Sequence, residues 1–328
     1  MLTIKEIAAM AKVSRSTVSR ALNNSGYVGE DARKRIEKVI KETGYIPNEQ
    51  AKALRTKKTK VIGVILPTIQ TETSSKIVTG LGKELAIHGY QILLANTNLD
   101  KNKEIEYLDL LKVRQVDGII LIATNTELVL LQKIKELNIP FAMIGQEAAD
   151  IFSVTYGDYQ TAQTLTSLLI ERGHKKIAFI GVDESDRAVG FLRKKGYLDV
   201  MATNNLPVEK AWVQKGIFDI DSGFNAMEQI MTNAMDKPTA IFAVTDRLAI
   251  GALNYLKAND FELPNDMAVV SIGGSELSAH VVPALTTVDF RYEEAGEASA
   301  KQLLALIREE KVAEKIMIDY RLIIRDSV

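Results

Sequence analysis

The chain has no cysteine, few histidines and no long uninterrupted apolar run. Without cysteine it can form no disulfide, no thiolate metal site and no cysteine nucleophile. It has 3 histidines, and His88, His174 and His280 lie too far apart for metal-ligand spacing. No apolar run approaches the roughly 20 residues of a membrane-spanning helix, and the first residues lack the apolar core of a signal peptide. We expect a cytoplasmic protein without a metal site.

The motifs of common α/β enzymes are also missing. Gly80 and Gly82 lack the third glycine of a dinucleotide-binding fingerprint, and the chain has no Walker A sequence. No serine, histidine and aspartate follow one another in the order that a nucleophile elbow requires. Acidic pairs such as Asp183 and Asp186 are more typical of a polar loop than of a general acid and base. We therefore expect no catalytic activity and no cofactor.

Basic residues are concentrated at one end of the chain, although the formal net charge is only −1. Residues 1–60 hold 14 Lys and Arg against 6 Asp and Glu, a net charge of +8. The remaining residues hold 27 against 36, a net charge of −9. A basic region attracts the phosphates of nucleic acid and an acidic body repels them. A solvated surface gives the same count, so this charge supports DNA binding only together with a motif.

Such a motif is present in residues 1–48. Thr3 and Glu6 have capping-box spacing at the start of one short helix, and Ser14 precedes a second helix over residues 15–23. A third helix is expected from near residue 29 to Gly44, a residue typical of helix ends. Two short helices joined by a tight turn and supported by a third form a helix-turn-helix DNA-binding headpiece. Residues 49–60 are rich in basic side chains. This composition predicts a hinge that is a loose linker in isolation and a helix when docked.

From residue 61 onward, short apolar runs alternate with helical patterns. The runs are residues 61–66, 91–95, 118–122, 141–144, 153–156, 176–180, 211–215, 240–244, 269–272 and 285–288. The first helical patterns between them are residues 74–88, 101–115 and 126–137. Continuous apolar strands between helices indicate parallel sheets that are covered on both faces. The length suits two α/β lobes, with a ligand in the crevice at the carboxyl ends of the strands.

This order of head, basic hinge and two-lobed body resembles the LacI-type family of bacterial repressors over the whole chain. The head motifs in family register are Thr3-Ile-Lys-Glu-Ile-Ala8, Val13-Ser14, Thr17-Val-Ser-Arg20, Gly44-Tyr-Ile-Pro-Asn48 and Ala51-Lys-Ala-Leu54. Those in the body are Val116-Asp-Gly-Ile-Ile120, Gly173-His-Lys-Lys-Ile-Ala178, Pro238-Thr-Ala-Ile-Phe242, Thr245-Asp246, Ala249-Ile-Gly251 and Pro283-Ala-Leu-Thr-Thr287.

The resemblance implies that the second helix enters the major groove of DNA. Arg15 and Ser16 stand at the two positions that usually select bases, and Arg20 stands at a third. The alternative for Arg15 is a phosphate contact, which positions the protein without reading sequence. Phosphate contacts are expected from Thr3, Ser14, Thr17, Ser19, Asn23 and Asn48. Val18 and Leu22 are expected in the core of the headpiece.

The hinge adds Ala51, Leu54 and Arg55 to the expected DNA-binding residues. Leu54 matches the family's wedge leucine, which opens a central base step when the hinge helices of two subunits enter the minor groove. The alternative is that Leu54 is a hydrophobic staple within the hinge. A wedge formed by two hinges implies a homodimer on a pseudo-palindromic operator.

For the body, the resemblance implies a periplasmic-binding-protein-like fold in which the chain crosses between the lobes near residues 160, 289 and 320. The N-terminal lobe is expected to hold residues 61–160 and 290–319. The C-terminal lobe is expected to hold residues 161–289 and 320–328.

Effector contacts are expected from loops that face the crevice between the lobes. Arg193 stands at the family's sugar-hydroxyl arginine, and Phe218 stands where an aromatic ring stacks on the sugar. The remaining expected contacts are Thr68, Gln146, Thr245, Asp246 and Ser275. For Asp246 the alternative is that it only caps the helix that follows it.

The body motifs resemble trehalose-operon-type repressors, which respond to a phosphorylated disaccharide. Thr68 and Gln146, however, stand where that branch has phosphate-binding arginines, so Arg187, Arg193 or Lys194 would have to supply the charge. The resemblance implies a repressor of a carbohydrate-utilisation operon whose effector is a sugar or sugar phosphate, such as trehalose, sucrose or a phosphate of either. The alternatives are a catabolite-control regulator with a protein corepressor, a sugar-transport protein and an α/β enzyme.

Overall fold

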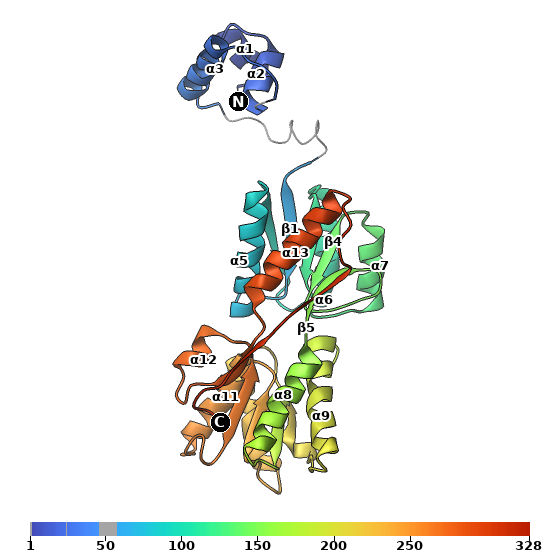
Figure 1. Ribbon diagram of the computed structural model, residues 1–328, viewed down its shortest axis with the longest axis vertical. Coiled ribbons are helices and arrows are strands. Elements are labelled where there is room, and N and C mark those ends of the chain that lie inside the picture. The colour runs from blue at the N-terminus through green and yellow to red at the C-terminus, as the bar shows by residue number, and fades with distance from the viewer. Residues whose placement is uncertain (1, 24, 46–57) are drawn as a thin grey trace. The chain divides into compact units, whose positions relative to one another are not determined.

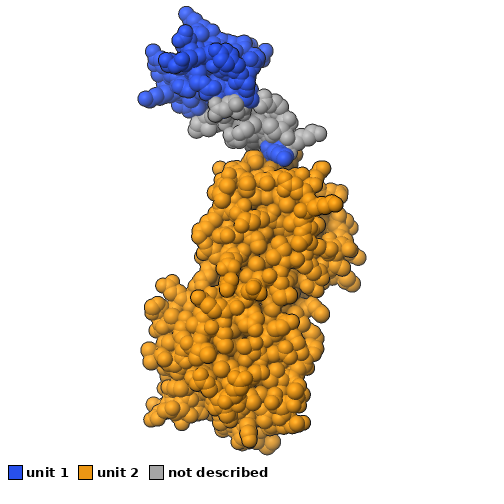
Figure 2. All heavy atoms as spheres, in the orientation of Figure 1, with its two compact units in different colours: residues 1–59 blue, residues 60–328 orange. Residues whose placement is uncertain are grey.

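The computed structural model describes residues 2–23, 25–45 and 58–328, which fall into two compact units, residues 1–59 and 60–328 (Figure 2). No helix among the described residues is long and apolar enough to cross a membrane. The expected contacts Asn48, Ala51, Leu54 and Arg55, together with the side chain of Asn23, lie outside the described residues.

The first unit contains the three helices that the sequence predicts: α1 (Ile4–Met10), α2 (Arg15–Asn23) and α3 (Glu30–Thr43). The capping box is confirmed, because Thr3 Oγ1 accepts from the amide of Glu6 over 3.4 Å while the amide of Thr3 donates to Glu6 Oε2 over 2.7 Å. Ser14 Oγ accepts from the amide of Thr17 over 3.1 Å at the start of α2. The helix α3 ends at Gly44, whose φ of 63° is the left-handed conformation that glycine tolerates.

One apolar cluster holds these three helices together. Its buried members are Ile7, Ala8, Ala11, Val18, Ile36, Val39 and Tyr45. Leu22 packs against this cluster and is partly buried, so both residues of α2 that were expected in the core are there. Because α2 buries the face with Val18, its opposite face is exposed.

The second unit contains two sheets, and both are built mainly from parallel strands (Figure 1). All neighbouring strands of the first sheet are parallel, in the order β11-β5-β4-β3-β1-β2. Its strands are β1 (Val61–Leu66), β2 (Gln91–Asn96), β3 (Gly118–Ile122), β4 (Phe141–Ile144), β5 (Phe152–Tyr156) and β11 (Lys315–Ile318).

The second sheet has the order β12-β10-β9-β8-β6-β7. Its strands are β6 (Ile177–Gly181), β7 (Val213–Lys215), β8 (Ala240–Ala243), β9 (Ala268–Ile272), β10 (Thr286–Asp289) and β12 (Arg321–Ile323). The expected strand over residues 211–215 is only partly right, because residues 210–212 form a 3-10 turn before β7. The edge strand β12 is antiparallel to β10, which the expectation of parallel sheets did not include.

Helices cover both faces of each sheet, as the apolar strands predict. Around the first sheet lie α5 (Glu72–Ile87), α6 (Lys101–Val113), α7 (Leu128–Glu136) and α13 (Tyr292–Ile307). Around the second lie α8 (Asp158–Glu171), α9 (Arg193–Thr203), α10 (Ile220–Asn233), α11 (Asp246–Ala258) and α12 (Glu276–His280). In β1, Ile62 and Val64 belong to one apolar cluster and Ile65 to another, so both faces of this strand are buried.

The chain passes between the two sheets three times: between β5 and α8, between β10 and α13, and between β11 and β12. An aromatic side chain lies in or directly next to each passage. Phe290 stacks on Tyr156 with ring centroids 4.9 Å apart, and it lies edge-on to Tyr292 and Tyr320 at 6.1 and 6.4 Å. This aromatic cluster joins the three connections in a single packed group beside the cavity described below.

Candidate functional site

The exposed face of α2 carries two arginines. Arg15, Ser16 and Arg20 are exposed, whereas Thr17 and Ser19 are half-buried. At the N-terminal end of this helix, Ser14 Oγ lies 2.7 Å from Ser16 Oγ and 2.8 Å from Thr17 Oγ1. Thr3 is exposed at the start of α1. The face therefore offers guanidinium groups that can bind base edges and hydroxyls at a helix N-terminus that can bind phosphate.

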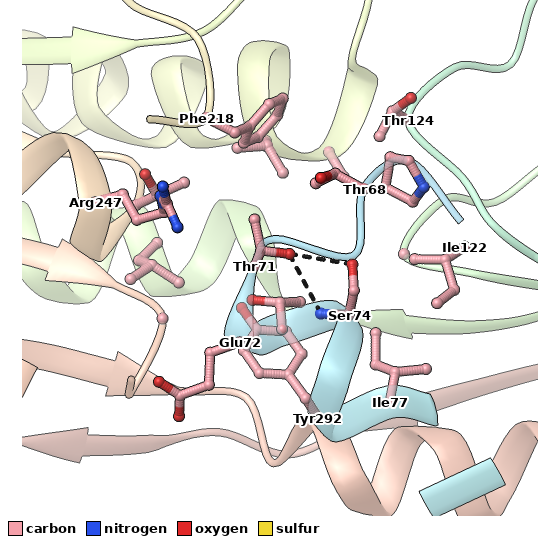
Figure 3. A pocket seen from close by; sticks show the side chains of 18 of the residues that line it. Thr68, Thr71, Glu72, Ser74, Ile77, Ile122, Thr124, Phe218, Arg247 and Tyr292 are labelled. Carbon is pink, nitrogen blue, oxygen red and sulfur yellow. Dashed lines mark hydrogen bonds between the residues drawn. The ribbon is translucent and has the colours of Figure 1, made fainter. Parts of the chain in front are cut away.

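The second unit contains a cavity of about 270 Å³ at the carboxyl ends of strands from both sheets (Figure 3). All seven residues that the sequence predicts to bind an effector line this cavity: Thr68, Gln146, Arg193, Phe218, Thr245, Asp246 and Ser275. The volume lies near the lower end of the range for ligand pockets, roughly 300–1,000 Å³. The cavity is therefore suited to one small molecule.

Arg193 is held within the cavity wall by groups of the protein itself. Its Nε donates to Asp158 Oδ1 over 2.7 Å, its Nη1 donates to the carbonyl of Val244, and its guanidinium lies 5.4 Å from the ring of Phe290. Burial raises the pKa of the Asp158 carboxyl, and the charge of Arg193 opposes that rise. The charge of Arg193 is thus balanced before any ligand binds.

Asp246 connects three segments of the second sheet. Its Oδ1 accepts from the hydroxyls of Ser271 over 2.5 Å and Thr287 over 2.6 Å, and its Oδ2 accepts from the amide of Ser275 over 2.7 Å. The alternative that Asp246 only caps α11 is wrong, because Thr245 is the capping residue. Asp246 therefore fixes the position of the loops that line the cavity.

Gln146 connects the two sheets across the cavity. It follows β4, and its Nε2 donates to Asp186 Oδ1 over 2.7 Å. Its Oε1 accepts from the amide of Ala188 over 3.2 Å. Burial raises the pKa of Asp186 to about 6, while hydrogen bonds from Val189 and Gln146 oppose the rise. Both ends of the Gln146 amide are thus occupied by protein groups.

Thr68, Phe218 and Ser275 lie on loops that face the cavity. Thr68 follows β1 and accepts from the amide of Gln70 over 3.1 Å. Phe218 is half-buried between β7 and α10, and Figure 3 shows its ring beside the cavity. Ser275 caps α12 by accepting from the amide of Ser278 over 3.2 Å.

Of the three residues expected to supply positive charge to a phosphate, Arg193 lines the cavity and the other two do not. Arg187 is exposed and stacks on Phe191 at 5.6 Å, and Lys194 pairs with Glu184 at 2.7 Å. A cation that the sequence reasoning missed, Arg247, does line it. The signal was available, since Arg247 directly follows Asp246 after a predicted strand.

The described residues contain no group of three His, Cys, Asp or Glu that could hold a metal ion. The cavity wall combines a mostly apolar surface with a small number of hydroxyls, amides and charged groups. Such a lining is suited to binding a small polar molecule.

Comparison with known proteins gives matches for both units. The model of the bacterial regulatory proteins of the lacI family matches residues 3–48, and that of a periplasmic binding protein-like domain matches residues 166–328. The NTD biosynthesis operon regulator NtdR of Bacillus subtilis (strain 168) is 33% identical over 331 residues, which cover 100% of both chains. The probable HTH-type transcriptional repressor ExuR of the same organism is 33% identical, with 100% of this chain and 98% of that protein covered.

Among solved structures, the complex of the transcriptional regulator CelR with cellobiose has a TM-score of 0.76 at 28% identity and covers 100% of both chains. The named relatives are transcriptional regulators and not enzymes. The alignment with NtdR covers the whole chain, from the helix-turn-helix head to the end of the second sheet, at 33% identity. The chain belongs to the lacI family of bacterial regulatory proteins.

Proposed function

We propose that the protein represses a carbohydrate-utilisation operon and that a sugar or sugar phosphate in the cavity controls its affinity for the operator. The observation that carries this proposal is the convergence of the seven expected effector residues on one cavity of a chain with a helix-turn-helix head. The similar regulator CelR is described as a complex with the sugar cellobiose. Trehalose, sucrose and their phosphates are the first candidates for this chain. Because its target, the chromosome, lies in the cytoplasm, we propose that the protein is cytoplasmic.

On the DNA side, we propose that Arg15, Ser16 and Arg20 read bases from α2. All three side chains are exposed, and Ser16 and Arg20 lie on the face of α2 opposite Val18, which supports this role. Phosphate contacts are assigned to Thr3, Ser14, Thr17, Ser19, Asn23 and Asn48. The hinge contacts are assigned to Ala51, Leu54 and Arg55.

We propose that the protein acts as a homodimer. The edge strand β2 of the first sheet exposes 40% of Leu93 and 47% of Leu94, and the nearby Ile87 at the end of α5 is 74% exposed. An apolar edge strand exposed to solvent favours association with another chain. A dimer carries two Leu54 residues, as a wedge in a pseudo-palindromic operator requires.

We divide the body into two lobes, residues 61–160 with 290–319 and residues 161–289 with 320–328. An effector in the cavity between them stabilises one arrangement of the lobes, and the first lobe continues directly into the hinge. Ligand binding can shift this equilibrium only by its differential affinity for the two arrangements. A tenfold change in operator affinity corresponds to ~1.4 kcal/mol of coupling.

The test is a titration of an operator, selected from random duplexes, by fluorescence anisotropy with and without each candidate. The neutral panel is glucose, trehalose and sucrose, and the phosphorylated panel is glucose 6-phosphate and trehalose 6-phosphate. We expect at least one compound to change operator affinity tenfold or more, and Phe218→Ala to reduce that response. Ile217→Ala is the matched control, because Ile217 is 57% exposed and does not line the cavity. An operator affinity unchanged by every one of these compounds, and by the uronates of the same sugars, contradicts the proposal.

A further inference from the structure

Arg247 differs from the other charged side chains that line the cavity. Of the described cations in the lining, Arg193 pairs with Asp158 at 2.7 Å and Lys76 pairs with Glu72 at 2.7 Å, whereas Arg247 has no carboxylate partner. Its Nη1 donates only to the backbone carbonyl of Gln70, over 3.1 Å. A backbone carbonyl carries no net charge, so no ion pair among the described residues balances the positive charge of Arg247.

The guanidinium of Arg247 also has an unused donor. Its Nε is buried from solvent and has no hydrogen-bond partner among the described residues. A buried donor without an acceptor costs about 1–3 kcal/mol, and more for a charged group. A ligand oxygen that comes within reach of this atom removes that cost. Nη1 is occupied by Gln70, and no described residue is hydrogen-bonded to the edge formed by Nε and Nη2. This edge of a guanidinium can bind a carboxylate through two parallel hydrogen bonds.

The carboxylates of the cavity wall do not compete for this edge. Asp246, next to Arg247 in the chain, accepts hydrogen bonds from Ser271, Thr287 and Ser275. Asp186 accepts from the Gln146 amide and from the amide of Val189 over 2.9 Å.

The position of Arg247 adds to its preference for an anion. Gln70 precedes Thr71, which caps the 16-residue helix α5, and Figure 3 shows Arg247 beside the start of this helix. The positive end of the helix dipole therefore favours a negative group at the same end of the cavity. Arg247 belongs to α11 and Gln70 to the loop after β1, so a group bound here touches segments of both sheets.

We propose that the effector is a sugar acid whose carboxylate is bound by Arg247, an inference that rests on the proposed sugar-controlled function. A carboxylate carries one negative charge and matches the one unbalanced guanidinium of the lining. A phosphate monoester carries about −1.5 to −2 near neutral pH, so one guanidinium leaves part of its charge uncompensated. The hydroxyl-bearing part of the sugar then lies along the remainder of the cavity.

The experiment is a calorimetric titration of the full-length protein. Three sugars are used, glucose, galactose and mannose, and each is supplied in three forms: the neutral sugar, the uronate and the 6-phosphate. We expect one uronate to bind at least tenfold more tightly than its neutral parent and its phosphate. Arg247→Gln should weaken that uronate roughly 10- to 100-fold and leave the neutral sugar unchanged. Arg247→Lys should give an intermediate loss, because it keeps the charge and loses the planar fork.

Arg172→Gln is the control for the loss of an arginine, since Arg172 is exposed and lies outside the cavity lining. The inference is overturned if neutral sugars bind and no uronate does, or if Arg247→Gln weakens both to the same extent. It is also overturned if a 6-phosphate binds most tightly through Arg247. In these cases the proposed sugar control stands. If no compound of this panel or of the operator titration binds, both proposals fail.

Discussion

The Nε atom of Arg193 lies 2.7 Å from Oδ1 of Asp158 in the cavity wall, and the two side chains are only 5% and 2% exposed. A buried ion pair contributes little net stability, but removal of one partner leaves a charge without compensation. The two partners differ in how they can respond. A carboxyl can take up a proton, and burial already raises the pKa of Asp158, whereas a guanidinium stays charged.

We therefore predict that Asp158→Asn destabilises the body more than Arg193→Met does. The cost of Asp158→Asn should be about 3–5 kcal/mol in the free energy of unfolding by urea. The cost of Arg193→Met should fall as the pH is lowered, because Asp158 then becomes protonated. The double variant Asp158→Asn/Arg193→Met provides the control, and strictly additive costs of the two substitutions would contradict this account of the pair.

Glu104 predicts a second pH effect, at a residue that does not line the cavity. This carboxyl on α6 is 2% exposed and accepts a hydrogen bond from Asn125, and burial raises its pKa to about 7. Since the usual value is about 4.3, the folded protein holds this proton more tightly than the unfolded chain does between pH 4 and 7. The contribution of Glu104 to stability therefore falls as the pH rises through this range.

Glu104→Gln keeps an acceptor for Asn125 and removes the charge. We expect it to leave stability nearly unchanged at pH 4 and to raise it by roughly 2–3 kcal/mol at pH 8. Urea unfolding at both pH values measures the difference. The control is Glu106→Gln on the exposed side of the same helix. Equal effects of the two substitutions at pH 8 would rule out burial as the cause.

The sequence predicts features that depend on neighbouring residues and misses those that depend on tertiary contacts. The spacing of Thr3 and Glu6 determines a capping box locally, and the apolar run at residues 61–66 coincides with β1. The strand β12 is 3 residues long and only half-buried at a sheet edge, so it has no pattern of its own. Likewise, the partner of Gln146 is 40 residues away in the chain.

The same distinction applies to the cavity. Resemblance to a known family placed all seven expected residues around it. It could not reveal that Arg193 and Gln146 are already occupied by other protein groups, because those groups are not adjacent in sequence. The sequence also could not show that Arg247 has no carboxylate partner among the described residues. That property depends on which side chains meet in the folded chain.

The crossing of α5 and α13 depends on glycine. A Cβ at Gly80 would lie 2.0 Å from the carbonyl oxygen of Glu293, and a Cβ at Gly296 would lie 2.2 Å from that of Ile77. The two helix backbones are therefore in direct contact. We predict that Gly80→Ala separates them and lowers the melting temperature by several degrees, a loss of more than about 2 kcal/mol.

Gly82 on the same helix supplies the matched control. Its nearest neighbour to an added Cβ is the end of the Ile92 side chain at 4.0 Å, so the space is open. Gly82→Ala should stabilise the protein by about 0.5–1 kcal/mol, because alanine favours the helix more than glycine. A similar loss in both variants would indicate a general intolerance of α5 to substitution.

Arg15 allows a direct test of base reading by the head. It is exposed on α2, one turn from the buried Val18, so Arg15→Ala should leave the three-helix core intact. If Arg15 forms two hydrogen bonds to a guanine, its loss costs about 1–3 kcal/mol against the preferred base and relaxes specificity at that position alone. Affinity selection on operator duplexes randomised at single positions measures this. The exposed Lys41→Ala on α3 controls for the loss of one positive charge. Uniform weakening across all sequences, with a salt dependence reduced by about one unit, would assign Arg15 to a phosphate instead.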